Sequence, residues 1–433
     1  MKKNIISLAA LLIASATFVA CSSDDNIIEE KPVQPTEQVY TMTVNAQKGG
    51  DAADSRATTR ALSLSGSTLN ATWTAGDAVE VWTSDGTTTK YGTLTAETSG
   101  ASTKLKGTLS SLPSNGQSLL LKYLSPAYAT QDGTLTGSAS SIDRVCDYAT
   151  ATVTATVVGS NVTATDANFV NQQAIVKFTL KNKADASALS VNKLFVTAGG
   201  TTCEVTPSGA TSELYVAVPA IASGRVTLTA LSGSTYYDYL KTGVTLAQSQ
   251  YYTISASLTE VKPKNYATTA SIGRVVAADD KMYASVESAA NAGTTAVAVI
   301  AQRTSLTSAY IAIAISDESG KMNWSAANSA CENKTPKLSG ANWVFPTVDQ
   351  WKSMCAANGG NENSYTGLDA LITKAGGTAL DTEWYYWTST DGTNNDSKRN
   401  MLLNDSNGTV VFNTGSDKSS LLLVRAFLGF LGN

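Results

Sequence analysis

Histidine is absent from the 433-residue sequence, and this absence limits the chemistry that the chain can perform. Without an imidazole, neither a Ser-His-Asp triad nor a Cys-His pair can form, and the commonest zinc ligand is missing. The sequence also shows no spaced set of acidic residues of the kind that binds calcium. We therefore expect a protein that is not an enzyme and that uses neither a metal nor another cofactor.

Charged residues are scarce as well, at 15% of the chain, and the formal net charge is −4. No basic stripe is present that could neutralise phosphates, so we expect no nucleic-acid partner. Thr, Val and Tyr are frequent, whereas Glu/Lys-rich stretches are few, which favours strands over helices. The length allows two or three domains, each able to bury its own core.

The first 37 residues have the pattern of an export leader and a linker. Two lysines precede an apolar stretch over 5–20 that is too short for a comfortable membrane span. Residues 22–37 are rich in acids and carry two prolines, which predicts a flexible tether. We therefore expect a signal peptide over 1–20 and a tether over 21–37.

The run FVAC at 18–21 resembles a bacterial lipoprotein lipobox, which implies that Cys21 carries acyl chains, palmitate among them. The acids after Cys21 resemble the signal that sends lipoproteins of Bacteroidetes-type bacteria to the cell surface. The resemblance implies a surface-exposed lipoprotein of the outer membrane. An ordinary secretory signal with a chance cysteine, and a merely solvated linker, are the alternatives.

From residue 39 the sequence alternates between apolar and polar residues. Tyr40, Met42 and Val44 alternate with polar neighbours, which predicts a half-buried strand. Short apolar pulses separated by turn residues continue to about residue 260. This spacing predicts one or two antiparallel sandwiches.

Several stretches of this region resemble the fimbrillin-like subunits of type V pili: TRAL at 59–62, LNATWTAGD at 69–77, AIVKFTL at 174–180 and LAQSQYYTISASL at 246–258. The resemblance implies two transthyretin-like antiparallel β-sandwiches, over 38–180 and 181–260. It also implies cleavage after Arg60, or after Arg56 as second choice, with loss of the first strand. Another pilus subunit would then donate a strand. The alternative is that both arginines are solvated loop residues on a protein that keeps its lipid.

Residues 261–433 differ in pattern from the preceding region, because they contain two stretches with helical spacing. Trp324, Ala327 and Cys331 lie at helical spacing, and VDQWKSMCAA at 348–357 has the same period. The stretches WVFPT at 343–347, YYWTST at 385–390 and VRA at 424–426 resemble a domain of Bacteroidetes surface proteins. That domain is similar to C-type lectin-like and formylglycine-generating-enzyme-like folds, so the resemblance implies an α+β domain after the mainly β region.

The motifs by which such domains bind calcium and sugar are absent, and no cysteine pair lies near the end of the domain. Binding is then the expected role, because aromatic and amide side chains suit sugar or protein recognition. The candidate ligand contacts are Trp384, Tyr386, Asn394, Asn395, Asp396 and Arg399. The alternative to ligand contact is that Tyr385 and Trp387 have a structural role.

Four cysteines remain besides Cys21, and export permits disulfides. Three connectivities are possible from sequence alone. Pairing Cys146 with Cys203 and Cys331 with Cys355 keeps both bonds within domains, and two buried free thiols are the alternative for the second pair.

Together these features predict an accessory or tip subunit of a type V pilus that adheres through its C-terminal lectin-like domain. Its partners would be other pilus subunits, the outer membrane through the lipid, and a glycan or protein on a host or bacterial surface. It would stay on the outer membrane or be released into the pilus after cleavage. The alternative is a non-polymerising outer-membrane lipoprotein, either a pilus anchor or a glycan- or protein-binding module.

Overall fold

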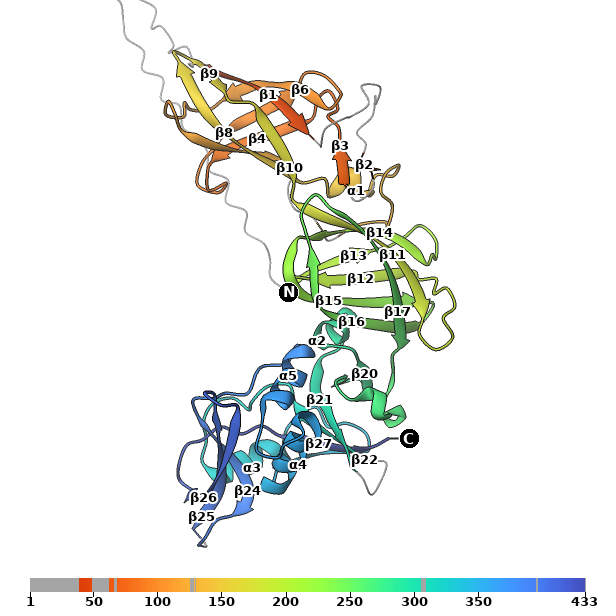
Figure 1. Ribbon diagram of the computed structural model, residues 1–433, viewed down its shortest axis with the longest axis vertical. Helices are drawn as coiled ribbons and strands as arrows, with labels where there is room; N and C mark the ends of the chain where they lie inside the picture. The colour runs from red at the N-terminus through yellow and green to blue at the C-terminus, as the bar shows by residue number, and fades with distance from the viewer. Residues whose placement is uncertain are drawn as a thin grey trace, which may run out of the picture. The chain divides into compact units, whose positions relative to one another are not determined.

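The computed structural model describes residues 39–48, 62–65, 68–124, 128, 130–304, 309–394 and 396–432. These residues form a mainly β structure with a few short helices, which confirms the predicted fold class (Figure 1). Among the described residues, no helix has the length and apolarity needed to cross a membrane.

The first sheet has eight strands in the order β10-β1-β6-β5-β4-β7-β8-β9. Strand β10 also pairs with β8, and β1 with β9, so the sheet closes on itself. The strands are β1 (Tyr40–Lys48), β4 (Ala78–Thr83), β5 (Lys90–Ala96), β6 (Ser102–Leu109), β7 (Ser118–Tyr123), β8 (Ala149–Val158), β9 (Asn161–Ala164) and β10 (Ala167–Asn171). Their inward side chains form one core around Trp73, Leu94 and Leu121.

The second sheet has seven strands in the order β13-β12-β15-β16-β17-β11-β14. They are β11 (Gln173–Asn182), β12 (Lys193–Ala198), β13 (Thr201–Val205), β14 (Glu213–Pro219), β15 (Ile221–Ser232), β16 (Thr235–Leu246) and β17 (Tyr251–Glu260). Strands β16 and β17 pair only at Tyr237–Glu260 and Asp238–Thr259. The sheet can therefore fold over at this point and enclose a core between its two halves.

The boundary between the two β regions differs from the one expected after residue 180. Strand β11 spans that position and pairs with β14 and β17, so it belongs wholly to the second sheet. A small hairpin, β2 (Leu62–Ser65) and β3 (Thr68–Ala71), and the short helix α1 (Ile142–Val145) precede it in the chain. Leu62 and Ala71 of the hairpin pack with Ile175 and Ala217 of the second sheet.

The C-terminal region has a seven-stranded sheet in the order β18-β20-β19-β21-β22-β27-β23 and a three-stranded sheet, β24-β25-β26. The strands are β18 (Lys262–Pro263), β19 (Val275–Ala277), β20 (Lys281–Tyr283), β21 (Ala296–Arg303), β22 (Ala309–Ala314), β23 (Ala341–Val344), β24 (Tyr385–Asp391), β25 (Ser397–Asn404), β26 (Thr409–Asp417) and β27 (Phe427–Leu431). The helices are η1 (Lys264–Tyr266), η2 (Thr269–Ser271), α2 (Val286–Asn291), α3 (Trp324–Glu332), α4 (Val348–Gly359) and α5 (Thr366–Lys374).

The two helical patterns read from the sequence correspond to α3 and α4. Thr347 caps α4: its Oγ1 accepts a hydrogen bond from the Gln350 amide at 3.1 Å, and the Gln350 side chain accepts one from the Thr347 amide at 2.8 Å. This reciprocal pair satisfies two amides that have no partner within the helix. The helices cover the seven-stranded sheet, with α4 and α5 packed on one core cluster and α3 on another.

Candidate functional site

The candidate site is the position of β1 in the first sheet. On one side β1 pairs antiparallel with β6 at eight positions, from Tyr40–Leu109 to Gln47–Ser102. On the other side it runs parallel to β9 over 41–43 and to β10 over 46–48. The strand predicted around Tyr40, Met42 and Val44 is thus the one that closes the sheet.

Strand β1 turns every second side chain into the core, as its alternating sequence predicts. Met42, Val44, Ala46 and Lys48 are each at most 1% exposed, whereas Asn45 and Gln47 are exposed. The strand therefore contributes three apolar side chains and one cation to the interior of the first sheet.

Lys48 is one of the residues of this site that sequence reasoning missed. Its side chain is fully buried and forms an ion pair with Asp147, which is also buried. The Lys48 ammonium lies 3.5 Å from the centre of the Tyr123 ring and 5.2 Å from that of Trp73. Trp73 in turn makes edge-to-face contacts with Tyr123, at 5.4 Å, and with Phe169, at 5.1 Å.

We call Asp147 with Trp73, Tyr123 and Phe169 the cation cage. A carboxylate and the faces of aromatic rings both attract a cation, and the attraction grows where water is excluded. The signal for Lys48 was present in the sequence, since the inward positions 42, 44 and 46 extend by the same step to 48. A lysine at that step reads as the end of the buried face, which is why it was missed.

Several predicted site residues lie outside the described residues. Lipidation at Cys21 and cleavage at Arg56 or Arg60 fall in residues 1–38 and 49–61, and Asn395 is also outside. These remain predictions.

The candidate ligand contacts of the C-terminal region are only partly brought to one surface. Trp384 is 43% exposed and is covered on one face by the Lys321 ammonium. Asn394 and Asp396 are exposed in the loop between β24 and β25. Arg399 is half-buried, and its Nε donates to the Asn413 carbonyl at 3.3 Å.

Tyr386 corrects the predicted set, because it is fully buried and cannot contact a ligand at the surface. Its hydroxyl donates to Asp317 at 3.0 Å and accepts from the Asp381 amide at 2.7 Å. Burial raises the pKa of Tyr386 well above its usual range. Trp387 is buried too, in a different cluster, because β24 lies between two cores and so hides both of its faces there. Tyr385 is the partly exposed one, at 38%.

The predicted disulfides are also corrected, because Cys146, Cys203, Cys331 and Cys355 are buried cysteines that are not joined in disulfide bonds. Cys331 lies on α3 in the cluster that contains Ile300, whereas Cys355 lies on α4 in the cluster that contains Val299. Val299 and Ile300 are neighbours on β21 and therefore face opposite sides of the sheet. The sheet thus lies between the thiols of Cys331 and Cys355. Burial raises the pKa of each of the four thiols to about 12.

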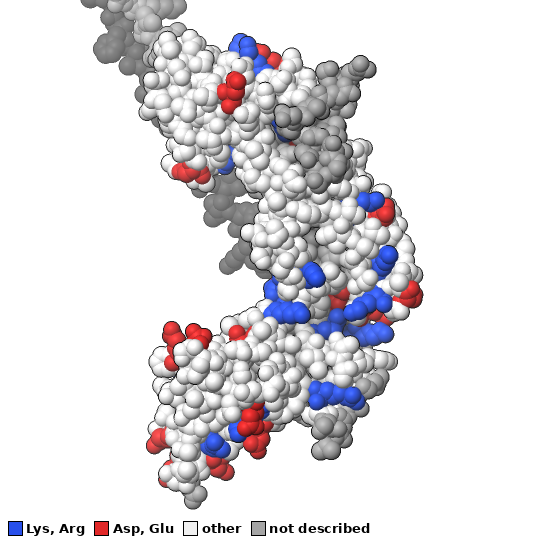
Figure 2. Space-filling model, viewed as in Figure 1, with Lys and Arg blue, Asp and Glu red and all other residues white. Residues whose placement is uncertain are grey.

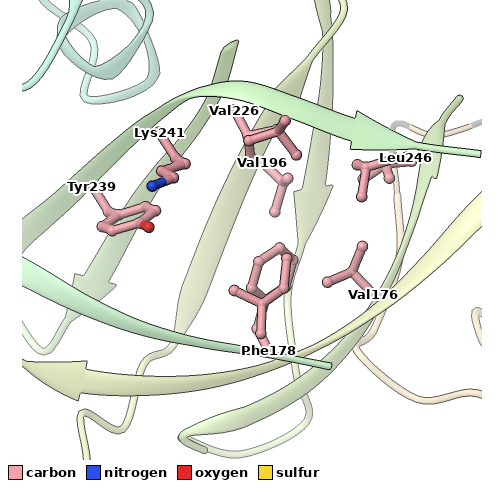
Figure 3. A pocket seen from close by; sticks show the side chains of 10 residues that line it. Val176, Phe178, Val196, Val226, Tyr239, Lys241 and Leu246 are labelled. Carbon is pink, nitrogen blue, oxygen red and sulfur yellow. The ribbon is translucent and has the colours of Figure 1, made fainter. Parts of the chain in front are cut away.

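No group of three or more Cys, Asp or Glu side chains within the described ranges is placed to hold a metal ion. A cavity of about 40 Å³ lies in the core of the second sheet, where Val176, Phe178 and Leu246 approach one another (Figure 3). Drug-sized ligands occupy roughly 300–1,000 Å³, so this gap is a packing space and not a ligand site.

Charge is sparse on the surface. Figure 2 shows a displayed face that is mostly uncharged, with acidic side chains scattered over it and several Lys and Arg side chains gathered near its middle. Several exposed charges are paired locally, as in Lys90–Glu80 at 2.5 Å and Lys352–Glu362 at 3.2 Å. Such pairs contribute little to stability and create no strong field for a charged partner.

No family model matches the chain, and neither does any curated protein. Similar solved structures include a fimbrial protein from Bacteroides ovatus, at 12% identity and a TM-score of 0.24, covering 83% of this chain and 95% of that one. A fimbrial assembly protein from Parabacteroides distasonis is similar at 13% identity and a TM-score of 0.27, covering 51% of this chain and 91% of that one. The tip fimbrial protein Mfa3 from Porphyromonas gingivalis is similar at 9% identity and a TM-score of 0.25, with coverages of 52% and 95%.

Proposed function

We propose that the protein is a surface lipoprotein that acts as an accessory or tip subunit of a type V pilus. The observation that carries this function is the place of β1. It closes the first sheet, and it is joined to the next strand by residues 49–61, which include Arg56 and Arg60. One cut in that segment would separate the closing strand from the rest of the chain.

Loss of β1 would leave a slot suited to another strand. Strand β6 would lose its partner along eight positions, and β9 and β10 would lose theirs on the opposite side. The inward places of Met42, Val44 and Ala46 would also empty. Unpaired backbone groups and an open apolar face are costly, so a strand donated by another pilus subunit would fill the slot.

The C-terminal region supplies the adhesive contact in this proposal. Trp384 and the exposed Asn394 and Asp396 offer an aromatic face and polar groups to a glycan or a protein on a host or bacterial surface. Acyl chains on Cys21 hold the chain to the outer membrane until cleavage releases it into the pilus. The proposal assigns no catalytic step and no nucleic-acid partner to the chain.

A second candidate is a non-polymerising lipoprotein, either a pilus anchor or a binding module. It is favoured by the complete seating of β1, whose inward side chains are all buried in the uncut chain. In that case the lipid on Cys21 is permanent and the first sheet never opens.

Digestion with an Arg-specific protease, followed by intact-mass analysis, separates the two candidates. We expect one main product that begins at Ala61 and then assembles with pilin. The control is Arg60→Ala combined with Arg56→Ala, which should keep β1 attached to the chain and fail to assemble. A wild-type chain that stays lipidated and uncut on cells displaying pili would support the anchor or binding module instead.

Adhesion is tested with the whole chain on glycan arrays and on immobilised matrix proteins. We expect binding that Trp384→Ala or Asp396→Ala lowers at least severalfold, with Val411→Ala, at another exposed apolar position, as the control. No binding to any glycan or matrix protein would contradict the adhesive role while leaving the strand exchange to be judged separately.

A further inference from the structure

The cation cage has a feature that apolar burial alone does not require. Three of the four inward residues of β1 are apolar, but the fourth is Lys48, whose ammonium is held by Asp147 and the rings of Tyr123 and Trp73. Asp147 and the three rings all belong to the part of the chain that follows residue 61. The cage would therefore stay in the first sheet when β1 leaves, and its cation would go.

A buried carboxylate that loses its cation becomes a strong selector for the next occupant. Asp147 is 1% exposed and Trp73 is fully buried, so water cannot freely replace the ammonium. Removing one partner of a buried ion pair is strongly unfavourable, because the remaining charge is poorly solvated. An incoming strand that restores a cation at this place would bind better than one that inserts an apolar side chain.

We propose that the first sheet selects a donor strand that carries Lys or Arg at the fourth inward position, opposite Asp147. The inference rests on the proposed strand exchange and adds the chemistry of the partner. The preferred strand has apolar residues at its first two inward positions, as in Met42 and Val44, and a small residue at the third, where Ala46 lies beside Ala167. The fourth is the cation.

The pattern also indicates which strand is not the donor. Strand β27 (Phe427–Leu431), the last strand among the described residues, has the sequence FLGFL and contains no lysine or arginine. A second copy of this chain would not satisfy the cage through that strand. The cage is therefore not expected to select β27 as its donor strand.

Peptide exchange on the cut chain tests the selection. The full chain, with exposed Arg144 and Arg303 changed to Lys to prevent other cuts, is cleaved by an Arg-specific protease. It is then freed of its N-terminal fragment in denaturant and refolded with labelled peptide. The peptides are the β1 sequence YTMTVNAQK and its Lys48→Arg and Lys48→Met forms. A further peptide combines Gln47→Lys with Lys48→Met, so that it keeps the charge but moves it to an outward position.

We expect the Lys and Arg peptides to be retained at least about tenfold more tightly than the Met peptide and the peptide with the moved charge. On a chain with Asp147→Asn this preference should disappear, whereas Asp166→Asn, at an exposed aspartate beside β1, should preserve it. The peptide contrast needs no substitution in the cage, so it remains decisive even if Asp147→Asn fails to fold.

The two levels of the hypothesis fail in different ways. If no peptide enters the refolded chain, including YTMTVNAQK, the strand exchange itself is wrong. If all four peptides enter with equal affinity, exchange stands and selection by the cage is wrong. Equal retention of the two lysine-bearing peptides would also overturn selection, since it would show attraction by overall charge only.

Discussion

Strands β1 and β11 both lie inside a sheet with a partner on each side, but they are attached to the chain in different ways. Strand β11 follows β10 after a single residue, Gln172, so no long segment offers a place to cut. Strand β1 is separated from the next strand by residues 49–61, with two arginines. Long linkers are frequent sites of proteolysis, so of these two strands β1 is the one that a single cut can release.

The interiors of the two sheets differ in a matching way. Strand β11 buries the apolar Ala174, Ile175 and Val176 on its two faces, and its one fully buried polar side chain, Gln173, is uncharged. Strand β1 adds a buried cation to its apolar face. Apolar contacts fix a strand but discriminate weakly between occupants, whereas a buried charge penalises a wrong one. The difference suggests that the second sheet is built for permanence and the first for a selected replacement.

The largest effect should follow removal of β1. After cleavage and loss of the N-terminal fragment, we expect amide protection in β6, β9 and β10 to collapse, since these strands lose their partner. Protection in β11, β14 and β17 should persist. Hydrogen–deuterium exchange read by mass spectrometry measures both sheets in one sample. Equal loss of protection in the two sheets would contradict the independence of the second.

A smaller effect is expected from the two lysines that lie on these strands. Lys48→Met should lower the free energy of unfolding of the first sheet by about 3–5 kcal/mol, because it removes one partner of the buried Lys48–Asp147 ion pair. Lys177→Met on β11 should have little effect, since its pair with Glu213 at 3.1 Å is open to solvent. Urea titration followed by hydrogen exchange in each sheet measures both. A similar loss of unfolding free energy in both variants would contradict the difference drawn here between β1 and β11.

In the C-terminal region, Tyr386→Phe should cost about 1–3 kcal/mol, because it removes a buried hydroxyl that donates to the Asp317 carboxylate. Trp384→Ala at the neighbouring exposed position should change stability by no more than about 0.5 kcal/mol. Neither substitution should alter hydrogen–deuterium exchange in the first sheet. Thermal unfolding of the two variants checks the contrast, and a larger loss from Trp384→Ala would show that this tryptophan is structural.

The smallest effect at neutral pH concerns the buried thiols. A pKa of about 12 makes the thiolate fraction near pH 8 roughly a thousandfold smaller than for an ordinary cysteine. We expect no reaction of the folded protein with a thiol reagent, and reaction of all four in denaturant. Because the thiols of the unfolded chain ionise first, stability is unaffected below about pH 9 and falls as pH rises toward 12. Rapid labelling of the folded chain would contradict the burial.

Local patterns predicted the elements of this fold better than its closure. The alternation at Met42 and Val44 and the cap at Thr347 depend on neighbouring residues, so sequence alone indicates β1 and the start of α4. The closure of the first sheet depends on pairing between residues 40–48 and 161–171, which no local period contains. The predicted boundary after residue 180 fell inside β11 (Gln173–Asn182) for the same reason, since the pairing of β11 with β14 and β17 is not contained in a local period.

The site residues show the same limit. Tyr386 was expected at the surface because an alternating strand has one exposed face, but β24 is covered on both faces at this point. Cys331 and Cys355 were paired because both lie on short helices of one domain, but a sheet separates them. Asp147 gave no sequence signal, because its partner Lys48 lies 99 residues earlier in the chain.

The most direct measurement is to lock β1 in place and follow incorporation into pili. Thr43 and Lys106 lie opposite each other on β1 and β6, so Thr43→Cys with Lys106→Cys can join the strands by a disulfide. Thr179→Cys with Glu213→Cys makes the matching bond between β11 and β14 in the second sheet. Both bonds form between one half-buried and one exposed position.

We expect the first lock to abolish incorporation under oxidising conditions and a reductant to restore it, because β1 must leave before a donated strand can enter. The second lock should leave incorporation unchanged. Incorporation of the chain with β1 locked, at the level of the wild type, would show that the first sheet does not exchange its strand.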